Sequence, residues 1–255
     1  MMFRHSLSPV LKWAGGKRWL IQRLRELIPA GKRLVEPFCG GLSVTLGIEP
    51  EGALCGDINP DLINLYRHLQ EGLIVETEYV NDETTYYQYR AEFNETTDLK
   101  RKAELFYYLN RTGFNGLCRY NSKGGYNVPY GKYKSITYRK DFTEYVELLS
   151  RYEFHCGSYN TLRINKDDVV YADPPYDTPF TKYAKEDFGW KDQCQLVDWW
   201  DVVGVPVITS NQATDRIVEL YKSHGYDMEI VSAPRRIAAN GDRSDAQEML
   251  AWKNL

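Results

Sequence analysis

The sequence predicts an α/β fold in which a largely parallel sheet carries an inserted, mostly helical domain. Short apolar runs alternate with amphipathic stretches near the N-terminus and again beyond residue 168, as expected for strands joined by helices. Between these parts, residues 61–110 keep a helical periodicity with no convincing strand. We therefore expect one domain built from residues 1–60 and 141–255, and a second domain, residues 61–140, inserted into it.

The N-terminal elements follow the pattern of a β-α-β unit. Leucine and isoleucine at helical spacing predict a helix that ends before Pro29, and the apolar run from Leu34 predicts a short buried strand. A turn at Gly40-Gly41 precedes the next helix. The predicted elements in order are a helix over 17–27, a strand over 34–38, a helix from residue 42 and a strand over 53–55.

The remaining elements are predicted in the same way. The basic stretch from Thr112 to Tyr138 is rich in glycine, asparagine and tyrosine, which favours a loop or hairpin over core structure. After it, strands and helices alternate again. The predicted elements are a strand over 169–172, a helix over 193–203, a strand over 205–209, a helix over 215–224 and strands near 226–231 and 249–252.

Size and composition indicate a globular chain that stays inside the cell. With 255 residues, 43% of them hydrophobic and 26% charged, the chain can bury a sizeable core, and no apolar run approaches the roughly 18 residues of a membrane span. Met1 to Ser8 lacks the pattern of a secretory signal, so we expect a cytoplasmic protein. Five scattered cysteines without a C-x-x-C pair and four dispersed histidines argue against disulfides and against a metal site.

The distribution of charge says more than the net value. The whole chain carries −3, yet residues 111–140 contain seven lysines and arginines and no acidic residue. Such a local excess of positive charge is the expected footprint of contacts with nucleic-acid phosphates.

A cofactor loop is predicted at Glu36-Pro37-Phe38-Cys39-Gly40-Gly41, between a strand and a helix. Asp57 follows Glu36 by 21 residues, the separation expected between a cofactor-cradling turn and an acid that binds ribose hydroxyls. A nucleoside-containing cofactor therefore fits. The absence of G-x-G-x-x-G disfavours a dinucleotide, and no phosphate-binding loop for ATP is present. A tight turn followed by a helix-capping Asp is the plain structural alternative.

Near the N-terminus, Lys12-Trp13-Ala14-Gly15-Gly16-Lys17 places two cations and an aromatic ring around a flexible turn. This combination suits a charged or aromatic ligand. A basic surface turn is an equally good interpretation of this segment alone.

Asp173-Pro174-Pro175-Tyr176 follows the apolar run from Val169, so its carboxylate is predicted to lie where a buried strand ends. The two prolines restrict the backbone and hold Asp173, the Pro174 carbonyl and the Tyr176 ring in one rigid turn. Two acceptors and a stacking ring suit a flat base with an exocyclic amino group. The alternative is an Asp-capped loop with a tyrosine on apolar surface.

The basic segment interleaves arginine, amides and aromatics in T-G-F-N-G-L-C-R-Y-N and N-V-P-Y-G-K-Y-K. Arginine can address guanine through two hydrogen bonds, amides address adenine, and aromatics can wedge into a base stack. A solvated basic loop is the alternative.

Taken together and in this order, K-W-A-G-G-K, V-E-P-F-C-G-G, D-I-N-P-D-L, N-R-T-G-F-N-G-L-C-R-Y-N, N-V-P-Y-G-K-Y and D-P-P-Y closely resemble the Dam-type DNA adenine-N6 methyltransferases, the D12 class and α group of amino methyltransferases. The resemblance spans nearly the whole chain. It implies a Rossmann-like S-adenosylmethionine-dependent methyltransferase sheet, with residues 61–140 as the target-recognition domain. It further implies methyl transfer to N6 of adenine in double-stranded DNA, typically within GATC, after the base is flipped out of the duplex.

The motifs and the resemblance together predict the residues of the site. The catalytic group is Asp173, Pro174, Pro175 and Tyr176. The group for S-adenosylmethionine is Trp13, Lys17, Glu36, Phe38, Gly40, Asp57 and Asp173. The group for DNA is Lys12, Phe114, Asn115, Leu117, Arg119, Asn121, Pro129, Lys132 and Tyr133. Phe114 stands where close relatives usually have Tyr, and Lys132 replaces an Arg, which puts a planar two-point phosphate contact in question.

The expected mechanism uses no metal, no covalent enzyme intermediate and no obligatory protein partner. Asp173 and the Pro174 carbonyl accept the two N6 hydrogens while Tyr176 stacks on the base, so that positioning and electrostatics supply the acceleration. The basic tail, residues 234–243, is expected to close over DNA. Two alternatives stay open, an amino methyltransferase for cytosine N4 or RNA and a DNA-binding protein without turnover.

Overall fold

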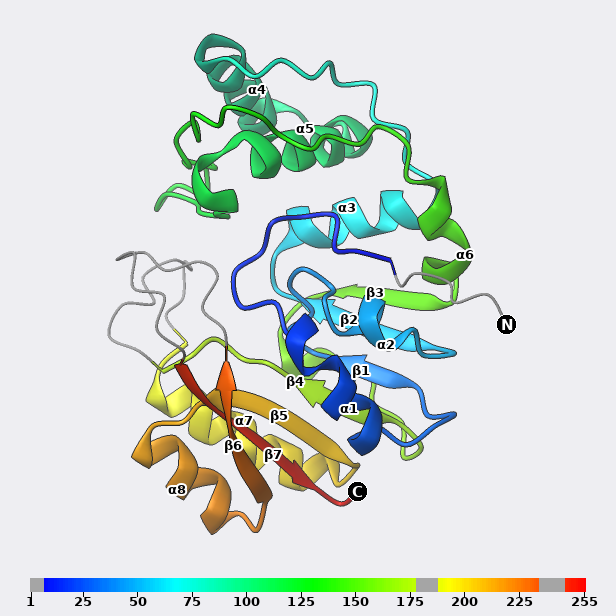
Figure 1. Ribbon diagram of the computed structural model, residues 1–255, viewed down its shortest axis with the longest axis vertical. Helices are drawn as coiled ribbons and strands as arrows, with labels where there is room; N and C mark the ends of the chain where they lie inside the picture. Colours follow the sequence, from blue (N-terminus) through cyan, green and yellow to red (C-terminus); the bar gives the residue numbers. More distant parts are fainter. Residues whose placement is uncertain (1–6, 178–187, 234–245) are drawn as a thin grey trace.

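The computed structural model describes residues 7–177, 188–233 and 246–255. Within these residues the centre of the molecule is a seven-stranded sheet with the order β3-β2-β1-β4-β5-β7-β6 (Figure 1). Its strands are β1 (Leu34–Glu36), β2 (Ala53–Asp57), β3 (Tyr152–Cys156), β4 (Val169–Ala172), β5 (Val207–Gln212), β6 (Asp227–Ala233) and β7 (Ala246–Lys253). β1 to β5 pair in parallel, and β7 runs antiparallel between β5 and β6. The predicted largely parallel, Rossmann-like sheet is confirmed.

Helices flank the sheet, and four of them lie in the region between β2 and β3 (Figure 1). They are α1 (Ile21–Leu27), α2 (Thr45–Ile48), α3 (Pro60–Gln70), α4 (Glu83–Glu95), α5 (Leu99–Thr112), α6 (Val146–Leu149), α7 (Trp190–Val203) and α8 (Asp215–Ser223). Single 3-10 turns cover Arg18–Leu20, Phe114–Gly116, Thr143–Tyr145 and Tyr159–Thr161. The predicted helical periodicity over 61–110 is thus three helices.

The structure shortens one predicted strand, β1, and adds a strand that the sequence did not predict, β3. β1 stops at Glu36, because Pro37 has no amide hydrogen for the ladder. β3 was not predicted at all. It pairs only with β2, and its exposed Glu153 gives it no continuous apolar run of the kind that marks a buried parallel strand.

Alternate residues of the strands feed two hydrophobic layers, one on each face of the sheet. Leu34, Val169 and Ile208 belong to the layer that also contains residues of α1, α3 and α5. Val35 and Val170 belong to the other layer, with α7 and α8. This period of two fixes which face each helix covers.

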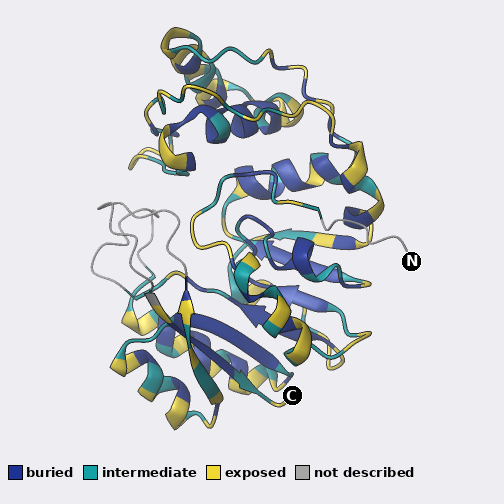
Figure 2. Cartoon of the chain, viewed as in Figure 1, coloured by how far each residue is buried: buried dark blue, intermediate teal, exposed yellow. Residues whose placement is uncertain are grey.

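The helices inserted between β2 and β3 share the first of these layers. Figure 2 shows buried residues running from the sheet through α3 into α5, and the same apolar cluster includes Tyr86 of α4 and Tyr126 of the basic segment. The helix α3 contacts β3 as well as α5. The division at residues 60/61 and 140/141 stays a prediction.

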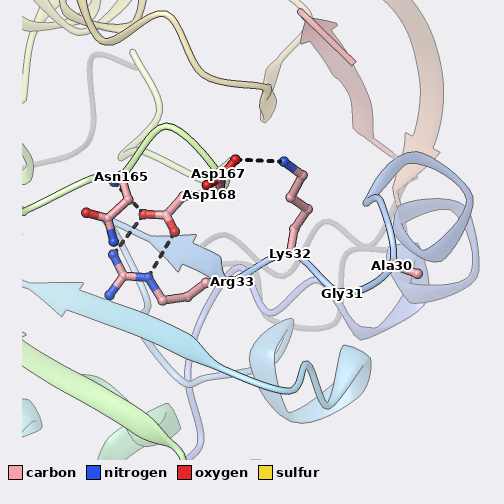
Figure 3. Close-up of a pocket in the computed structure, with 7 residues that line it drawn as sticks. All are labelled: Ala30, Gly31, Lys32, Arg33, Asn165, Asp167 and Asp168. Atoms are coloured by element: carbon pink, nitrogen blue, oxygen red, sulfur yellow. Dashed lines mark hydrogen bonds and ion pairs between the residues drawn. The ribbon is translucent and has the colours of Figure 1, made fainter.

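A cavity of about 530 Å³ opens beside Arg33 and Asp168, which directly precede β1 and β4 at the amino ends of these strands (Figure 3). The Arg33 guanidinium donates to both Asp168 oxygens, at 3.0 Å and 2.8 Å. Asp168 also accepts from the Asn165 amide at 2.7 Å. These hydrogen bonds connect the segments that precede β1 and β4, so we assign the cavity wall a role in stability.

We expect Asp168→Ala to lower the free energy of unfolding by about 2–3 kcal/mol, because the partly buried guanidinium loses both hydrogen bonds to Asp168 and keeps only the exposed Glu153 carboxylate, at 2.8 Å. Asp168 is 3% exposed and Arg33 23%, which moderates the loss relative to a fully buried pair. Chemical denaturation measures the change.

Asp167→Ala is the matched control. Asp167 lies 3.8 Å from Lys32 but is 99% exposed, so its removal should change stability by less than about 0.5 kcal/mol. Equal effects of the two variants would contradict a structural role for the Arg33–Asp168 pair.

Candidate functional site

The carboxyl ends of neighbouring parallel strands bring three acidic residues to one edge of the sheet. Glu36 ends β1, Asp57 ends β2 and Asp173 directly follows β4. Since β1 pairs with both β2 and β4, these positions lie side by side. Open α/β sheets bind their ligands at this edge, where the strand order reverses.

Asp173 is held by two donors from different parts of the chain. The Lys17 ammonium lies 2.9 Å from one carboxylate oxygen, and the Ser210 hydroxyl donates to the other at 2.9 Å. Lys17 is only 2% exposed and also donates to the Gly15 carbonyl at 2.9 Å. Because each carboxylate oxygen has two acceptor positions, Asp173 keeps capacity for a further donor.

The rest of the D-P-P-Y turn is fixed from behind by a buried amide chain. The Gln193 side chain donates to the Pro175 carbonyl at 2.8 Å, and Gln193 in turn accepts from Asn211 at 3.0 Å. Both amides are fully buried. Among the described residues, no hydrogen bond occupies the Pro174 carbonyl, so it is left as an acceptor.

The Tyr176 ring completes this turn. Its centroid lies 5.1 Å from the Lys17 ammonium. Burial, and next the charge of Asp173, raise the pKa of the Tyr176 hydroxyl, which therefore stays neutral. The Glu248 carboxylate faces that hydroxyl and adds to the rise of its pKa.

Glu36 is buried behind the cofactor turn. Its carboxylate accepts from the Thr45 amide at 2.9 Å and from the Thr45 hydroxyl, so it supports the first turn of α2. Burial raises the pKa of Glu36 to about 8, the Thr45 hydrogen bonds oppose the shift, and the charge of Asp173 adds to it.

Asp57 binds the backbone of the glycine turn. Its oxygens accept from the Gly40 amide at 3.1 Å and the Asn59 amide at 2.9 Å. Burial raises the pKa of Asp57, and these hydrogen bonds counteract the rise. The adjoining Ile58 is 65% exposed, so an apolar surface lies next to the acid.

Trp13 packs directly on the same turn. A β-carbon at Gly40, whose φ is +42°, would come within 2.7 Å of the Trp13 indole nitrogen, and one at Gly41 within 2.8 Å of the Trp13 β-carbon. The glycines are therefore required by close packing. The Phe38 ring contacts Tyr159 and Phe188, at centroid distances of 5.7 Å and 5.8 Å.

Three supporting residues were missed by sequence reasoning: Ser210 and Glu248, which lie near Asp173 and Lys17, and Gln193 behind Pro175. Glu248 of β7 lies 3.8 Å from the Lys17 ammonium, and burial raises its pKa. The polar run Thr209-Ser210-Asn211 after apolar strand residues was a usable signal for Ser210. Glu248 gave none, because it comes from an antiparallel strand far along the chain.

The basic segment, predicted to be a loop or a hairpin, forms a hairpin. Gly113 pairs with Tyr130, and Tyr120 pairs with Tyr126. Phe114 lies at its base and is 47% exposed, an unusual exposure for so large an apolar ring. Its neighbour Asn115 has φ +53°.

Arg119 is oriented across this hairpin by Asn127. The guanidinium donates to the Asn127 side chain at 2.7 Å and to the Asn127 carbonyl at 3.1 Å. Asn121 instead closes the hairpin tip, where its side chain accepts from the amides of Lys123 at 2.9 Å and Gly125 at 3.0 Å. The structure thus places Asn121 in a turn and leaves Arg119 with further donors.

Lys12, near the N-terminus, contacts both α5 and the basic segment. Asn110 donates to the Lys12 carbonyl and accepts from its amide, both at 2.8 Å. The Lys12 ammonium lies 3.7 Å from the Tyr133 ring centroid, and burial followed by the charge of Arg111 lowers its pKa. A β-carbon at Gly116, φ +62°, would lie 2.3 Å from that of Lys12, so the contact requires glycine.

Three other residues predicted to contact DNA belong to the same basic segment. Pro129 accepts from the Phe114 amide at 2.9 Å, Leu117 is half-buried, and Lys132 is exposed with φ +52°. The predicted tail contact, residues 234–243, lies outside the described residues.

Within residues 7–177, 188–233 and 246–255, no group of three or more His, Cys, Asp or Glu side chains is placed to hold a metal ion. No helix among the described residues is long and apolar enough to cross a membrane.

Comparisons with known proteins show which family the chain resembles. The family described as D12 class N6 adenine-specific DNA methyltransferase matches residues 13–237. The retron Ec67 DNA adenine methylase of Escherichia coli is 40% identical over 263 residues, 96% of this chain and 91% of the relative. The DNA adenine methylase of Vibrio cholerae is 39% identical over 262 residues, 94% of each chain. Among solved structures, the 23S rRNA methyltransferase ErmE covers 94% of this chain and 67% of its own, with a TM-score of 0.42 and 10% identity.

Fold and site define the class, a Rossmann-like α/β protein with acidic residues gathered at the carboxyl ends of its parallel strands. The chain belongs to the D12 class of N6 adenine-specific DNA methyltransferases, and it is an enzyme that methylates DNA.

We expect Glu36→Gln to reduce the pH dependence of stability. The pKa of Glu36 in the folded protein, about 8, exceeds its ordinary 4.5, so its contribution is complete below the lower value and is lost as the pH rises through the upper one. Gln can still accept from Thr45 and carries no charge. The unfolding temperature should therefore decrease more between about pH 6 and about pH 9 in the unaltered protein than in the variant.

The difference between the two proteins isolates Glu36, because the other carboxyl groups titrate in both. Parallel curves over this range would show that Glu36 is already ionised in the folded protein.

Proposed function

We propose that the protein transfers a methyl group from S-adenosylmethionine to N6 of adenine in double-stranded DNA, within GATC, after the adenine has been flipped into the site. The observation that carries the proposal is the placement of Asp173, with one oxygen on Lys17 and one on Ser210, beside the unoccupied Pro174 carbonyl acceptor. Adenine N6 has two hydrogens, and these two groups supply two acceptors.

The residues present fit S-adenosylmethionine. Its carboxylate matches the buried Lys17 ammonium, and its ribose hydroxyls match Asp57, which already binds the glycine turn through Gly40. Its flat base matches the exposed Ile58 and the Phe38 ring at the same edge. When bound, the cofactor supplies a methyl group on a positively charged sulfur.

The protein contributes position and electrostatics. Acceptance of both N6 hydrogens by Asp173 and the Pro174 carbonyl keeps the nitrogen lone pair from conjugating with the ring. Tyr176 stacks on the base and fixes its plane, while the Gln193 chain prevents the turn from shifting. After transfer the surplus proton would pass from N6 to the Asp173 carboxylate, and the cofactor, its methyl–sulfur bond broken, would leave as S-adenosylhomocysteine.

The DNA side of the proposal rests on the hairpin. Phe114 is exposed at its base, where a ring could occupy the gap left by a flipped nucleotide. Arg119 is aimed by Asn127 and keeps donors for guanine. Lys12, Leu117, Pro129, Lys132 and Tyr133 complete the proposed surface.

The decisive experiment incubates the protein with labelled S-adenosylmethionine and two duplexes of equal composition, one with GATC and one with that site scrambled. N6-methyladenine confined to the GATC duplex is the expected product. Methyl transfer to both duplexes would remove the assigned specificity, and N4-methylcytosine would remove the assigned base. No transfer to either duplex, with cofactor binding intact, would favour an RNA substrate or a binding protein without turnover.

In this assay we expect Asp173→Ala to lose activity by a factor of about a hundred or more while the protein remains folded, because one acceptor for N6 is removed. Thermal unfolding checks the fold. Ser210→Ala is the matched control, since it removes a donor to Asp173 but keeps the carboxylate, and its loss should be smaller. A near-normal rate for Asp173→Ala would end the acceptor assignment.

We expect Arg119→Ala to cost about 1–3 kcal/mol of discrimination at one base pair, measured as the ratio of kcat/KM for GATC and for duplexes altered at single positions. Lys134→Ala removes an exposed charge from the same basic segment and should weaken activity on all duplexes alike. A uniform loss for Arg119→Ala as well would make Arg119 a phosphate contact.

A further inference from the structure

The turn that carries Asp57 is also the start of α3. Asp57 accepts from the Asn59 amide at 2.9 Å, and the Asn59 side chain caps the helix by accepting from the amides of Asp61 at 3.0 Å and Leu62 at 3.2 Å. The position of the first turn of α3 is therefore fixed relative to the cofactor edge of the sheet.

The hairpin is fastened to this same turn. The Tyr120 hydroxyl donates to Asp61 at 2.7 Å, and the Asn59 side chain donates to the Cys118 sulfur at 3.3 Å. Asp61 is only 9% exposed, and its second oxygen lies 3.5 Å from the Lys102 ammonium of α5. A neutral hydroxyl bound to a buried carboxylate makes a charge-assisted and directional link.

Arg119 lies between the two fastened residues. Successive side chains of a hairpin strand alternate in direction, so Cys118 and Tyr120 are directed to α3 while Arg119 shares the other side with Asn127. The link to α3 thus controls how far the guanidinium stands from the edge of the sheet, and Asn127 controls its orientation.

We propose that Tyr120 and Asp61 form a positioning pair that sets the distance between base-reading Arg119 and the adenine site. This inference rests on the proposed function, in which Arg119 reads guanine and Asp173 receives adenine. A fixed distance matters because both bases belong to one short site, and a misplacement of about 1 Å can cost a hundredfold in rate. Neither residue touches the reacting atoms.

The test is Tyr120→Phe, which keeps the ring and its edge-on contact with Tyr126, at a centroid distance of 5.8 Å, and removes only the hydroxyl. The ratio of kcat/KM for the GATC duplex and for a duplex with both G·C pairs of the site replaced should fall by about fivefold or more, the equivalent of one hydrogen bond. The fall should come from the GATC duplex alone.

Tyr130→Phe is the matched control. Its hydroxyl donates to Asn81, at 2.9 Å to the carbonyl and 2.8 Å to the side chain, so the variant loses the same group from the same hairpin without touching α3. Its ratio should equal that of the unaltered protein.

A double-mutant cycle guards against a general effect on folding. In an Asp61→Ala background, Tyr120→Phe should change the ratio by less than about twofold, because the 2.7 Å partner of the hydroxyl is gone and only the longer contacts with Asn59, at 3.5 Å, and Cys118, at 3.8 Å, remain. Additive losses, or equal losses on both duplexes, would overturn the positioning role. The unaltered protein reports separately on the proposed function, since its own failure to discriminate would remove that proposal before any variant is compared.

Discussion

The parallel pairing of β1 with β2 and β4 is the constraint on which the rest of the molecule depends. It places Glu36, Asp57 and Asp173 at one edge, where their charges would repel one another in a partly dry environment. Three features of the structure reduce this repulsion. Lys17 is buried against Asp173, backbone amides bind Asp57, and the raised pKa of Glu36 lets that group stay protonated near neutral pH. Rigid support, with Gln193 behind the prolines, then keeps the resulting arrangement in one geometry.

Much of this organisation was available from the sequence. Apolar runs gave β2 and β4, helical periodicity gave the inserted helices, and the resemblance to a known family linked distant motifs to one site. The strand β3 was missed because an edge strand with a partly exposed face lacks a continuous apolar run. Ser210 and Glu248 were missed because their proximity to Lys17 and Asp173 is created by strand pairing, which periodicity does not encode.

The recognition hairpin shows the same limit in a different form. The predicted DNA contacts of the segment included the amides Asn115 and Asn121 and the cations Arg119 and Lys132, but the backbone uses one of these amides. Asn121 closes the tip, and Asn127, which was not predicted as a site residue, holds Arg119. Such divisions of labour depend on register, and the register became visible only with the Tyr120–Tyr126 pair.

The apolar layer shared by the sheet and the inserted helices has a consequence for evolution and engineering. A target-reading module attached through a linker could be exchanged between enzymes, but here α3 packs on β3 with one surface and on α5 with another. Excision of α3 with the rest of the inserted region would uncover sheet residues such as Phe154 of β3, whose ring centroid lies 5.5 Å from that of Tyr66. New sequence specificity is therefore easier to reach by altering side chains of the hairpin than by replacing the whole region, because the hairpin can change while the shared interior is conserved.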